Sequence, residues 1–492
     1  MKLKNLKCVI MFLFSAIFIL TSFTACQPSS KSASNPEFSE NPDLTKEEQT
    51  TVSEGDDLPD DLNYEGYVFN IYTRENSTFY RYVIEEDVSE ILNDSIYKRT
   101  RNVEERLGIT LAEKTYTDHN APRTFMLAGL GEFDMYNVRC SHAITFWLEG
   151  LTVEIPELPY IDLEKPYWNK TANKVSTLKN HQYIAFGAAN ICMYDFTFTL
   201  LFNKQMISDF SLESPYILVN NGKWTLDKMD EMMKVVISDL NGDGKFTIDD
   251  KYGYVSRAAD ALPAFWIGAE LLSVAKDEND IPYLAIGEEK FINLFQKVFE
   301  ITWDSNAWFT KPSGTLTMPS GTAGNVPATS VDLFMGNQSL FMDVQMPALS
   351  LLRGMETDFG IIPYPKYDEK QKNYYGRVGA FDTFVVDKSN AGFERTSAVI
   401  EALNSDSYKT VLPQYYEVCL KTRTSRDDES EDMLDIVFDN LIIDLGDTVW
   451  LDKIRDAVFA GMFSANNRNI ISKIDSMTVS IQKDIDKILE LE

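Results

Sequence analysis

The chain has 492 residues, with 75 Asp and Glu against 46 Lys and Arg, and a formal net charge of −29. This surplus of negative charge argues against a nucleic-acid partner and against binding to anionic lipid head groups. About 430 residues follow the first 62, which is too many for one hydrophobic core and predicts two lobes.

The first 25 residues have the order of a secretory signal peptide. Lysines at positions 2, 4 and 7 precede an apolar run over 9–20, and a small-residue stretch then leads to Cys26. The run is too short to span a bilayer comfortably. Phe23-Thr24-Ala25-Cys26 resembles the lipobox of bacterial lipoproteins. That resemblance implies cleavage before Cys26, lipid such as palmitate on this cysteine, and a location at the extracellular face of the cell membrane.

Residues 26–62 are rich in Ser, Pro, Thr and acidic residues and have almost no large apolar side chain. Such a composition cannot bury enough surface to fold, so the lipidated cysteine is expected to continue into a disordered acidic tether. Beyond it lie Cys140, Cys192 and Cys419. This odd count predicts no disulfide framework, and the three thiols are expected to be buried as small apolar groups.

Apolar periodicity predicts the elements of the folded part. Strands are expected over 66–72, 109–113, 133–138, 183–186, 196–203, 338–344, 358–362 and 378–386. Helices are expected over 88–107, 123–130, 226–238, 262–275, 290–303 and along the chain after 392. Thr225 is expected to cap the helix that follows it, with Asp227 in its first turn. The alternation of strands and helices predicts the α/β class.

One local motif has the ligand spacing of a calcium loop. Oxygen donors occupy its alternate positions, a glycine at position six permits the sharp turn, and Lys245 would contribute its backbone carbonyl. The predicted ligands are Asp239, Asn241, Asp243, Lys245, Thr247 and Asp250. Because a second loop and a clear exiting helix are missing, a structural Ca²⁺ is favoured over a switch. An acidic turn without an ion is the alternative.

The sequence contains no motif of a known catalytic class. It has three histidines and neither HExxH, GxSxG nor a phosphate-binding glycine loop. With 75 acidic residues, counting carboxylates gives no evidence for or against the carboxylate pair of a glycoside hydrolase. Seven Trp, 23 Tyr and 30 Phe suit stacking on sugar rings, although each aromatic taken singly also suits the core. The chain is therefore predicted to bind a small molecule and not to be an enzyme.

Several segments, in the same order, resemble the family 1 extracellular solute-binding proteins of bacterial carbohydrate ABC importers. The matching segments are 200–204, with Phe202 in place of the usual Tyr, 222–227, 339–343, 358–365 and 377–381. The resemblance implies a periplasmic-binding-protein-like type II fold, with two α/β lobes joined by crossing strands and a ligand cleft between them. It implies a first lobe of 63–195 plus 339–381 and a second lobe of 196–338 plus 382–492. Calcium loops after the 222–227 helix start are also implied by the resemblance.

The resemblance also implies the ligand-binding residues and the partners. The expected contacts are Arg139, Ser141, Tyr194, Asp195, Phe196, Trp266, Asp343, Gln345, Phe381 and Trp450. The expected function is capture of a sugar or oligosaccharide by a monomeric, membrane-anchored protein that delivers it to ABC permease subunits. Two other hypotheses stay open, namely a secreted carbohydrate-active hydrolase and a calcium-stabilised surface interaction protein.

Overall fold

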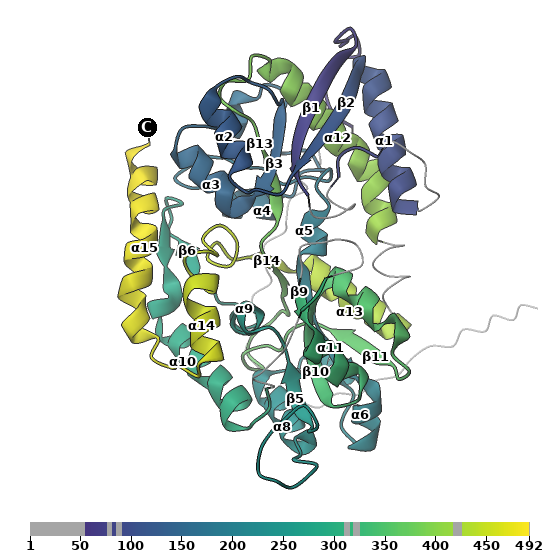
Figure 1. The fold of residues 1–492 in the computed structure, drawn as a ribbon, viewed down its shortest axis with the longest axis vertical. Helices are drawn as coiled ribbons and strands as arrows, with labels where there is room; N and C mark the ends of the chain where they lie inside the picture. Colours follow the sequence, from purple (N-terminus) through teal and green to yellow (C-terminus); the bar gives the residue numbers. More distant parts are fainter. Residues whose placement is uncertain are drawn as a thin grey trace, which may run out of the picture. The chain divides into compact units, whose positions relative to one another are not determined.

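The computed structural model describes residues 55–75, 81–84, 91–308, 315–317, 325–416 and 426–491. The predicted signal peptide, Cys26, most of the predicted tether and Cys419 lie outside these residues. Contacts divide the chain into Met1–Thr51 and Val52–Glu492. The second unit contains two main β-sheets, and each sheet with its helices is called a lobe below (Figure 1). No helix within the described ranges has the length and apolar character needed to cross a membrane.

The sheet of the first lobe has the strand order β13-β3-β1-β2. Strand β1 (Tyr67–Arg74) lies between β2 (Ile109–Tyr116) and β3 (Met135–Arg139) and runs parallel to both. Strand β13 (Asp382–Val385) joins the other side of β3 in the antiparallel direction. The carboxyl ends of β1, β2 and β3 therefore lie at one end of the sheet, next to the first residue of β13.

Helices cover both faces of this sheet, as its alternating side chains require. On one face α1 (Ile91–Leu107) and α12 (Phe393–Gln414) lie side by side (Figure 1). Phe69 and Ile71 of β1 belong to the same core cluster as residues of these two helices. On the other face the ring of Tyr72 stacks on Phe133, with 4.3 Å between ring centroids. The remaining helices of the lobe are η2 (Ile155–Glu157), α2 (Ala121–Ala128), α3 (Cys140–Leu148), α4 (Lys170–Ser176) and α5 (Cys192–Asp195).

The sheet of the second lobe has the order β14-β12-β4-β10-β5, with β11 also paired to β4. All seven residues of β4 (Thr197–Asn203) are buried, as expected for a central strand covered on both faces. Its antiparallel neighbours are β10 (Ser339–Gln345), β11 (Phe359–Ile362) and β12 (Gly376–Val378). Strand β5 (Tyr252–Val255) is parallel to β10, and β14 (Leu441–Ile443) is parallel to β12.

The second lobe is rich in helices. They are α6 (Lys204–Asp209), α7 (Pro215–Asn220), α8 (Leu226–Val236), α9 (Ala258–Gly268), η3 (Ala285–Gly287), α10 (Glu289–Phe299), η4 (Glu300–Asp304), α11 (Ala328–Met335), η5 (Met346–Gly354), α13 (Asp428–Asp439), η7 (Arg455–Phe459), α14 (Ala460–Ser464) and α15 (Ile471–Glu490). Two small hairpins complete it, β6 (Val274–Lys276) with β7 (Pro282–Leu284) and β8 (Thr315–Thr317) with β9 (Asn325–Pro327).

The predicted start of α8 is confirmed. The Thr225 side chain accepts a hydrogen bond from the Lys228 backbone N–H at 3.3 Å, and Asp227 lies in the first turn. Met229, Met232, Met233 and Val236 are buried on one face of this helix. Cys140 and Cys192 are likewise buried free thiols, as predicted.

The predicted lobe boundaries are wrong in two places. Residues 339–362 do not return to the first lobe, because β10 and β11 pair with β4 in the second sheet. Residues 382–414, predicted in the second lobe, belong to the first, because β13 pairs with β3 and α12 packs against α1. The segment predicted as one strand over 378–386 is accordingly split between β12 of the second sheet and β13 of the first. The chain thus returns to the first lobe at β13 and α12, and α13 takes it back to the second. Strand patterns show that a segment is a strand, whereas long-range pairing decides which sheet receives it.

Two smaller predictions also need correction. Residues 183–186 are not a strand, because the Phe186 N–H donates to the Asn173 side chain at 2.7 Å and only isolated bridges flank the segment. The tether is shorter than predicted, since the packed body already includes Asp56 and Leu58. Asp56 pairs with Arg106 at 2.6 Å, and Leu58 is buried in the core of the first lobe.

Substitution of Gly360 tests the packing around β4. A Cβ at this position would lie 2.3 Å from both Phe202 Cε1 and the Tyr216 hydroxyl oxygen, so Gly360→Ala requires the strands to move apart. We expect a loss of about 1–3 kcal/mol in the free energy of unfolding, measured by urea denaturation. Gly354→Ala is the matched control, because its Cβ would meet nothing within 4 Å. Equal stabilities of the two variants would contradict this packing.

Candidate functional site

The carboxyl ends of the first sheet bring four polar side chains together, here called the first-lobe rim. It consists of Arg74, Tyr116, Arg139 and Asp382. Arg74 and Tyr116 are paired in the β1–β2 ladder, and Arg139 is paired with Asp382 in the β3–β13 ladder. In open α/β sheets the loops at this end are the usual place for a ligand.

A buried ion pair fixes the first-lobe rim. Arg74 donates from Nη2 to Asp382 Oδ1 at 2.8 Å and from Nε to Oδ2 at 3.0 Å. The Asp382 backbone carbonyl accepts hydrogen bonds from the Asn190 amide and the Cys192 thiol. The first residue of β13 is therefore held by both its side chain and its backbone.

Two histidines lie beside the first-lobe rim, with 5.4 Å between the ring centroids of His119 and His142. Burial lowers the pKa of His119, and the positive charges of Arg139 and Arg74 lower it further. Burial also lowers the pKa of His142, again with Arg139 as the strongest nearby charge. The negative charge of Asp452, in the second lobe, raises the pKa of His142. This part of the second lobe therefore lies within electrostatic reach of the first-lobe rim.

The second sheet presents its own polar end, here called the second-lobe rim, formed by Ser256, Asp260, Asp343, Arg377 and Asp447. Ser256 follows β5 and donates to Asp343 Oδ2 at 3.0 Å, while Tyr364 donates to Oδ1. Burial, together with the charge of Asp260, raises the pKa of Asp343 to about 7.

Arg377 neutralises the other carboxylates of the second-lobe rim. It donates to Asp447 from Nε at 2.6 Å and from Nη2 at 3.0 Å, and to Asp260 from Nη2 at 3.2 Å. Arg455 adds a second cation on Asp447 at 2.9 Å. This rim is therefore a compensated network of buried charges.

Two adjacent segments cross between the lobes. One is α5 with Phe196, and the other is the stretch 379–381 between β12 and β13. The Gly379 N–H donates to the Phe196 carbonyl at 2.9 Å and so links them. A Cβ on Gly379 would lie 2.8 Å from the Phe198 ring, which explains a glycine at this close approach. Other contacts also join the lobes, since Lys276 of the second lobe donates to the Thr177 carbonyl at 2.8 Å.

The structure separates the predicted ligand-binding residues into three groups. The first group lies at or next to the two rims, with Arg139 followed by Ser141 in the first lobe and Asp343 followed by Gln345 in the second. Tyr194, Asp195, Phe196 and Phe381 lie in the crossing segments, where Asp195, Phe196 and Phe381 are buried.

Trp266 and Trp450 form the third group and lie in the core of the second lobe. Their exposed fractions are 2 % and 1 %. Their indole N–H groups donate to Asp444 at 2.8 Å and to Asp484 at 2.9 Å. Neither ring presents a face on which a sugar could stack, so the structure argues against both as sugar platforms.

Arg74, His119, His142 and Ser256 were not anticipated from the sequence. Arg74 and Ser256 stand at the carboxyl ends of β1 and β5, a position that also singled out Arg139. The histidines lie on segments that reach the rim only through the fold. Position at the carboxyl end of a strand was thus a usable sequence signal for Arg74 and Ser256, but not for the two histidines.

The predicted calcium loop is folded around its own backbone. Asp239 accepts from the N–H groups of Gly242 and Gly244, each at 2.7 Å, and Asp243 accepts from Lys245 at 2.8 Å. The Thr247 N–H lowers the pKa of Asp250, a fully buried residue that closes the loop. Within the described residues, no three His, Cys, Asp or Glu side chains are grouped as metal ligands, and the loop carboxylates instead accept hydrogen bonds from the loop's own N–H groups.

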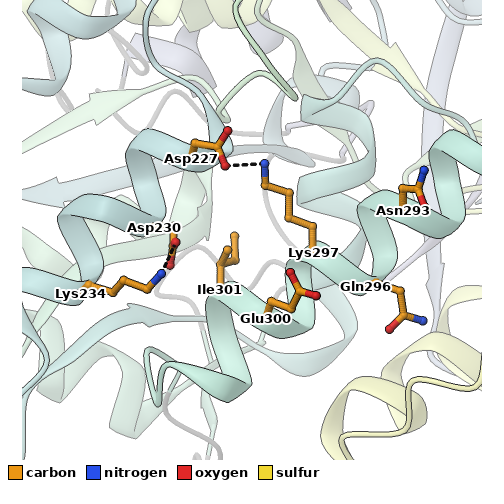
Figure 2. A pocket seen from close by; sticks show the side chains of 8 residues that line it. All are labelled: Asp227, Asp230, Lys234, Asn293, Gln296, Lys297, Glu300 and Ile301. Carbon is orange, nitrogen blue, oxygen red and sulfur yellow. Dashed lines mark hydrogen bonds and ion pairs between the residues drawn. The ribbon is translucent and has the colours of Figure 1, made fainter.

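A surface cavity of about 450 Å³ lies between α8, α10 and η4 (Figure 2). Asp227 pairs with Lys297 at 2.6 Å, and Asp230 pairs with Lys234 at 2.5 Å across its lining. None of these elements contributes to either rim, and the lining charges largely satisfy one another. The cavity is therefore not the candidate solute site.

No family model and no curated protein sequence matches this chain. Solved structures do match. The sugar-binding protein MalE from Xanthomonas citri has 12 % identity and a TM-score of 0.58, covering 86 % of this chain and 100 % of its own. A Staphylococcus aureus extracellular solute-binding protein in complex with maltose has 12 % identity and a TM-score of 0.56, covering 88 % and 98 %. The MalE domain from Bdellovibrio bacteriovorus bound to maltotriose has 14 % identity and a TM-score of 0.53, covering 85 % and 100 %.

These likenesses establish the fold. The chain has the type II periplasmic-binding-protein fold shared by sugar-binding proteins of ABC importers, with two α/β lobes and crossing segments, and this prediction is confirmed. The three reported structures are named as sugar-binding or solute-binding proteins.

Asp195 makes the crossing segments sensitive to pH. Burial raises its pKa to about 7, against the opposing effect of the hydrogen bond from Tyr415. The folded state therefore retains a proton that the unfolded chain releases, and stability from this group falls as pH rises from about 4 to 7. We expect Asp195→Asn to gain on the order of 3 kcal/mol over the parent between pH 5 and pH 8.

The measurement is urea unfolding of both proteins at the two pH values. Asp475→Asn, an exposed position on α15, is the control and should track the parent. A difference between Asp195→Asn and the parent that does not change with pH would show that Asp195 ionises normally.

Proposed function

We propose that this protein is the solute-binding subunit of an ABC importer, anchored to the membrane through lipid on Cys26, and that it captures a sugar or oligosaccharide for delivery to the permease. The observation that supports this most strongly is the fold match over 85–88 % of the chain to proteins named as sugar binders. Cys26 and the segment after it would keep the binder close to its permease at the extracellular face of the membrane.

The two rims suit a sugar in complementary ways. Arg139 and Ser141 come from the first lobe and Gln345 comes from the second, so hydrogen-bonding side chains of both lobes lie at the rims. Both carboxylate oxygens of Asp343 already accept hydrogen bonds from Ser256 and Tyr364. Closure of two lobes around a ligand is the usual motion of proteins with this architecture. Binding without chemical conversion of the sugar is the proposed activity.

A panel of neutral and acidic mono- and oligosaccharides, tested by isothermal titration calorimetry, checks this function. At least one member is expected to bind, and Gln345→Ala should weaken that binding about 10-fold because one side-chain amide is lost from the site. Gln205→Ala, an exposed glutamine on α6 of the same lobe, is the control and should bind as the parent does. Absence of binding across the whole panel would contradict the proposed function.

The 239–250 loop is proposed to hold a structural Ca²⁺. Its carboxylate, amide, hydroxyl and carbonyl oxygens are hard ligands of the type that calcium prefers. Several of these side chains already bend inward to accept loop N–H groups. An ion there would tie the end of α8 to the start of β5.

Millimolar CaCl₂ is expected to raise the melting temperature of the protein by about 1–3 °C over EGTA, because ligand bound only by the folded state stabilises it. Asp243→Asn should abolish most of that shift. Asp249→Asn is a matched control, since it removes one charge from the same loop at a position without a ligand role. No calcium-dependent shift in the parent would rule out this site.

A further inference from the structure

Arg139 is the one cation of the first-lobe rim without a counter-ion. In the β3–β13 ladder it stands directly opposite Asp382, but Arg74 occupies both carboxylate oxygens of that residue. Among the described residues, no group forms a hydrogen bond or ion pair with the Arg139 guanidinium, and its Nε is buried without a partner. In a chain with 75 acidic residues, an arginine left in this state requires an explanation.

The groups around Arg139 do not provide it with a counter-ion. Arg139 is the N-cap residue of α3, where the helix dipole presents its positive end and a cation is unfavourable. His119 and His142 lie within its electrostatic reach, and Arg139 is the strongest nearby charge acting on each. The acidic groups near them are Asp382, which Arg74 binds, and the exposed Asp118 and Asp452.

A second polar group is left unsatisfied in the same turn. Ser141 is 7 % exposed, and its hydroxyl oxygen is buried with no hydrogen-bond partner in the described structure. Cys140, between Arg139 and Ser141, donates its N–H to the Phe381 carbonyl at 3.0 Å. The first turn of α3 is thus held against the crossing segment, with an unpaired guanidinium and an unpaired hydroxyl on either side of the fixed residue.

Unpaired buried polar groups cost stability, and a cation at a helix N-terminus adds to that cost. A negatively charged group bound at this turn would remove both penalties. Arg is well suited to this role, because its planar fork binds carboxylate and sulfate oxygens in pairs.

We propose that the solute is an acidic sugar, and that Arg139, together with the first turn of α3, receives its carboxylate or sulfate group. This inference rests on the proposed sugar-binding function and specifies the class of solute. His119 and His142 lie within electrostatic reach of Arg139, and Arg74 takes part indirectly by occupying Asp382.

Matched sugar pairs test the charge directly. Calorimetry would compare digalacturonate with galactobiose, cellobiouronate with cellobiose, and sulfated with unsulfated galactobiose. At least one acidic member is expected to bind about 10-fold or more tightly than its neutral partner, and Arg139→Gln should remove most of that preference. Arg123→Gln is the charge-matched control, because it removes an arginine of α2 that pairs with Glu149. This variant should retain the preference for the acidic sugar.

The possible outcomes distinguish a failure of this inference from a failure of the proposed sugar-binding function. Preference for an acidic sugar that is lost in Arg139→Gln supports both. Binding of neutral sugars as tightly as their acidic partners overturns the acidic class and leaves sugar binding in place. Binding of no sugar overturns both. A preference for carboxylate over sulfate, or the reverse, identifies which anion the turn receives.

Histidine NMR gives a second readout that does not depend on knowing the sugar. The chain has three histidines, and His181, paired with Glu154 at 2.8 Å, lies away from the rim and is an internal control. Arg139→Gln should raise the pKa of His119 and His142, since a neighbouring positive charge is lost. Titration with digalacturonate should also raise both, whereas galactobiose should not. Unchanged pKa values for both residues in Arg139→Gln would place Arg139 away from them and contradict this geometry.

Discussion

The ion pair between Arg74 and Asp382 joins residues that are 308 positions apart in the sequence, and much of the first lobe's organisation depends on it. It fixes the first residue of β13 against the last residue of β1, at the point where the chain has just crossed from the second lobe. Breaking one partner of such a buried pair typically costs about 3–5 kcal/mol, because the other charge is left uncompensated. The same pair leaves Arg139 without the carboxylate that faces it in the ladder.

The two rims therefore differ in their electrostatics. In the second lobe, Arg377 and Arg455 share Asp260 and Asp447, and Asp343 is held by hydroxyl donors, so its charges are satisfied within the protein. In the first lobe, Arg74 is satisfied and Arg139 is not. The two rims are therefore not equivalent, because one is electrostatically compensated within the protein and the other carries an arginine without a counter-ion. Such an asymmetry favours one orientation of an asymmetric ligand held between the lobes.

Local sequence patterns predicted most elements well. The cap at Thr225, the helix that it begins and the strand over 196–203 were all evident, because each depends on residues near one another in sequence. The sheet to which each strand belongs was not evident from local sequence. Strands β10 and β11 were assigned to the wrong lobe, since their apolar residues would suit either sheet and only pairing with β4 decides between them.

The candidate site shows the same division. The family resemblance supplied all the candidate ligand-binding residues. The structure places Arg139 and Asp343 at the rims, whereas Trp266 and Trp450 are core residues whose indole N–H groups donate to Asp444 and Asp484. The sequence by itself determined the α/β class, the strand ends that bear polar groups and the likeness to sugar-binding proteins of importers. Only the tertiary structure decided which carboxylate Arg74 takes and that Arg139 stays unpaired, because such pairings join strands brought together by folding and not by chain order.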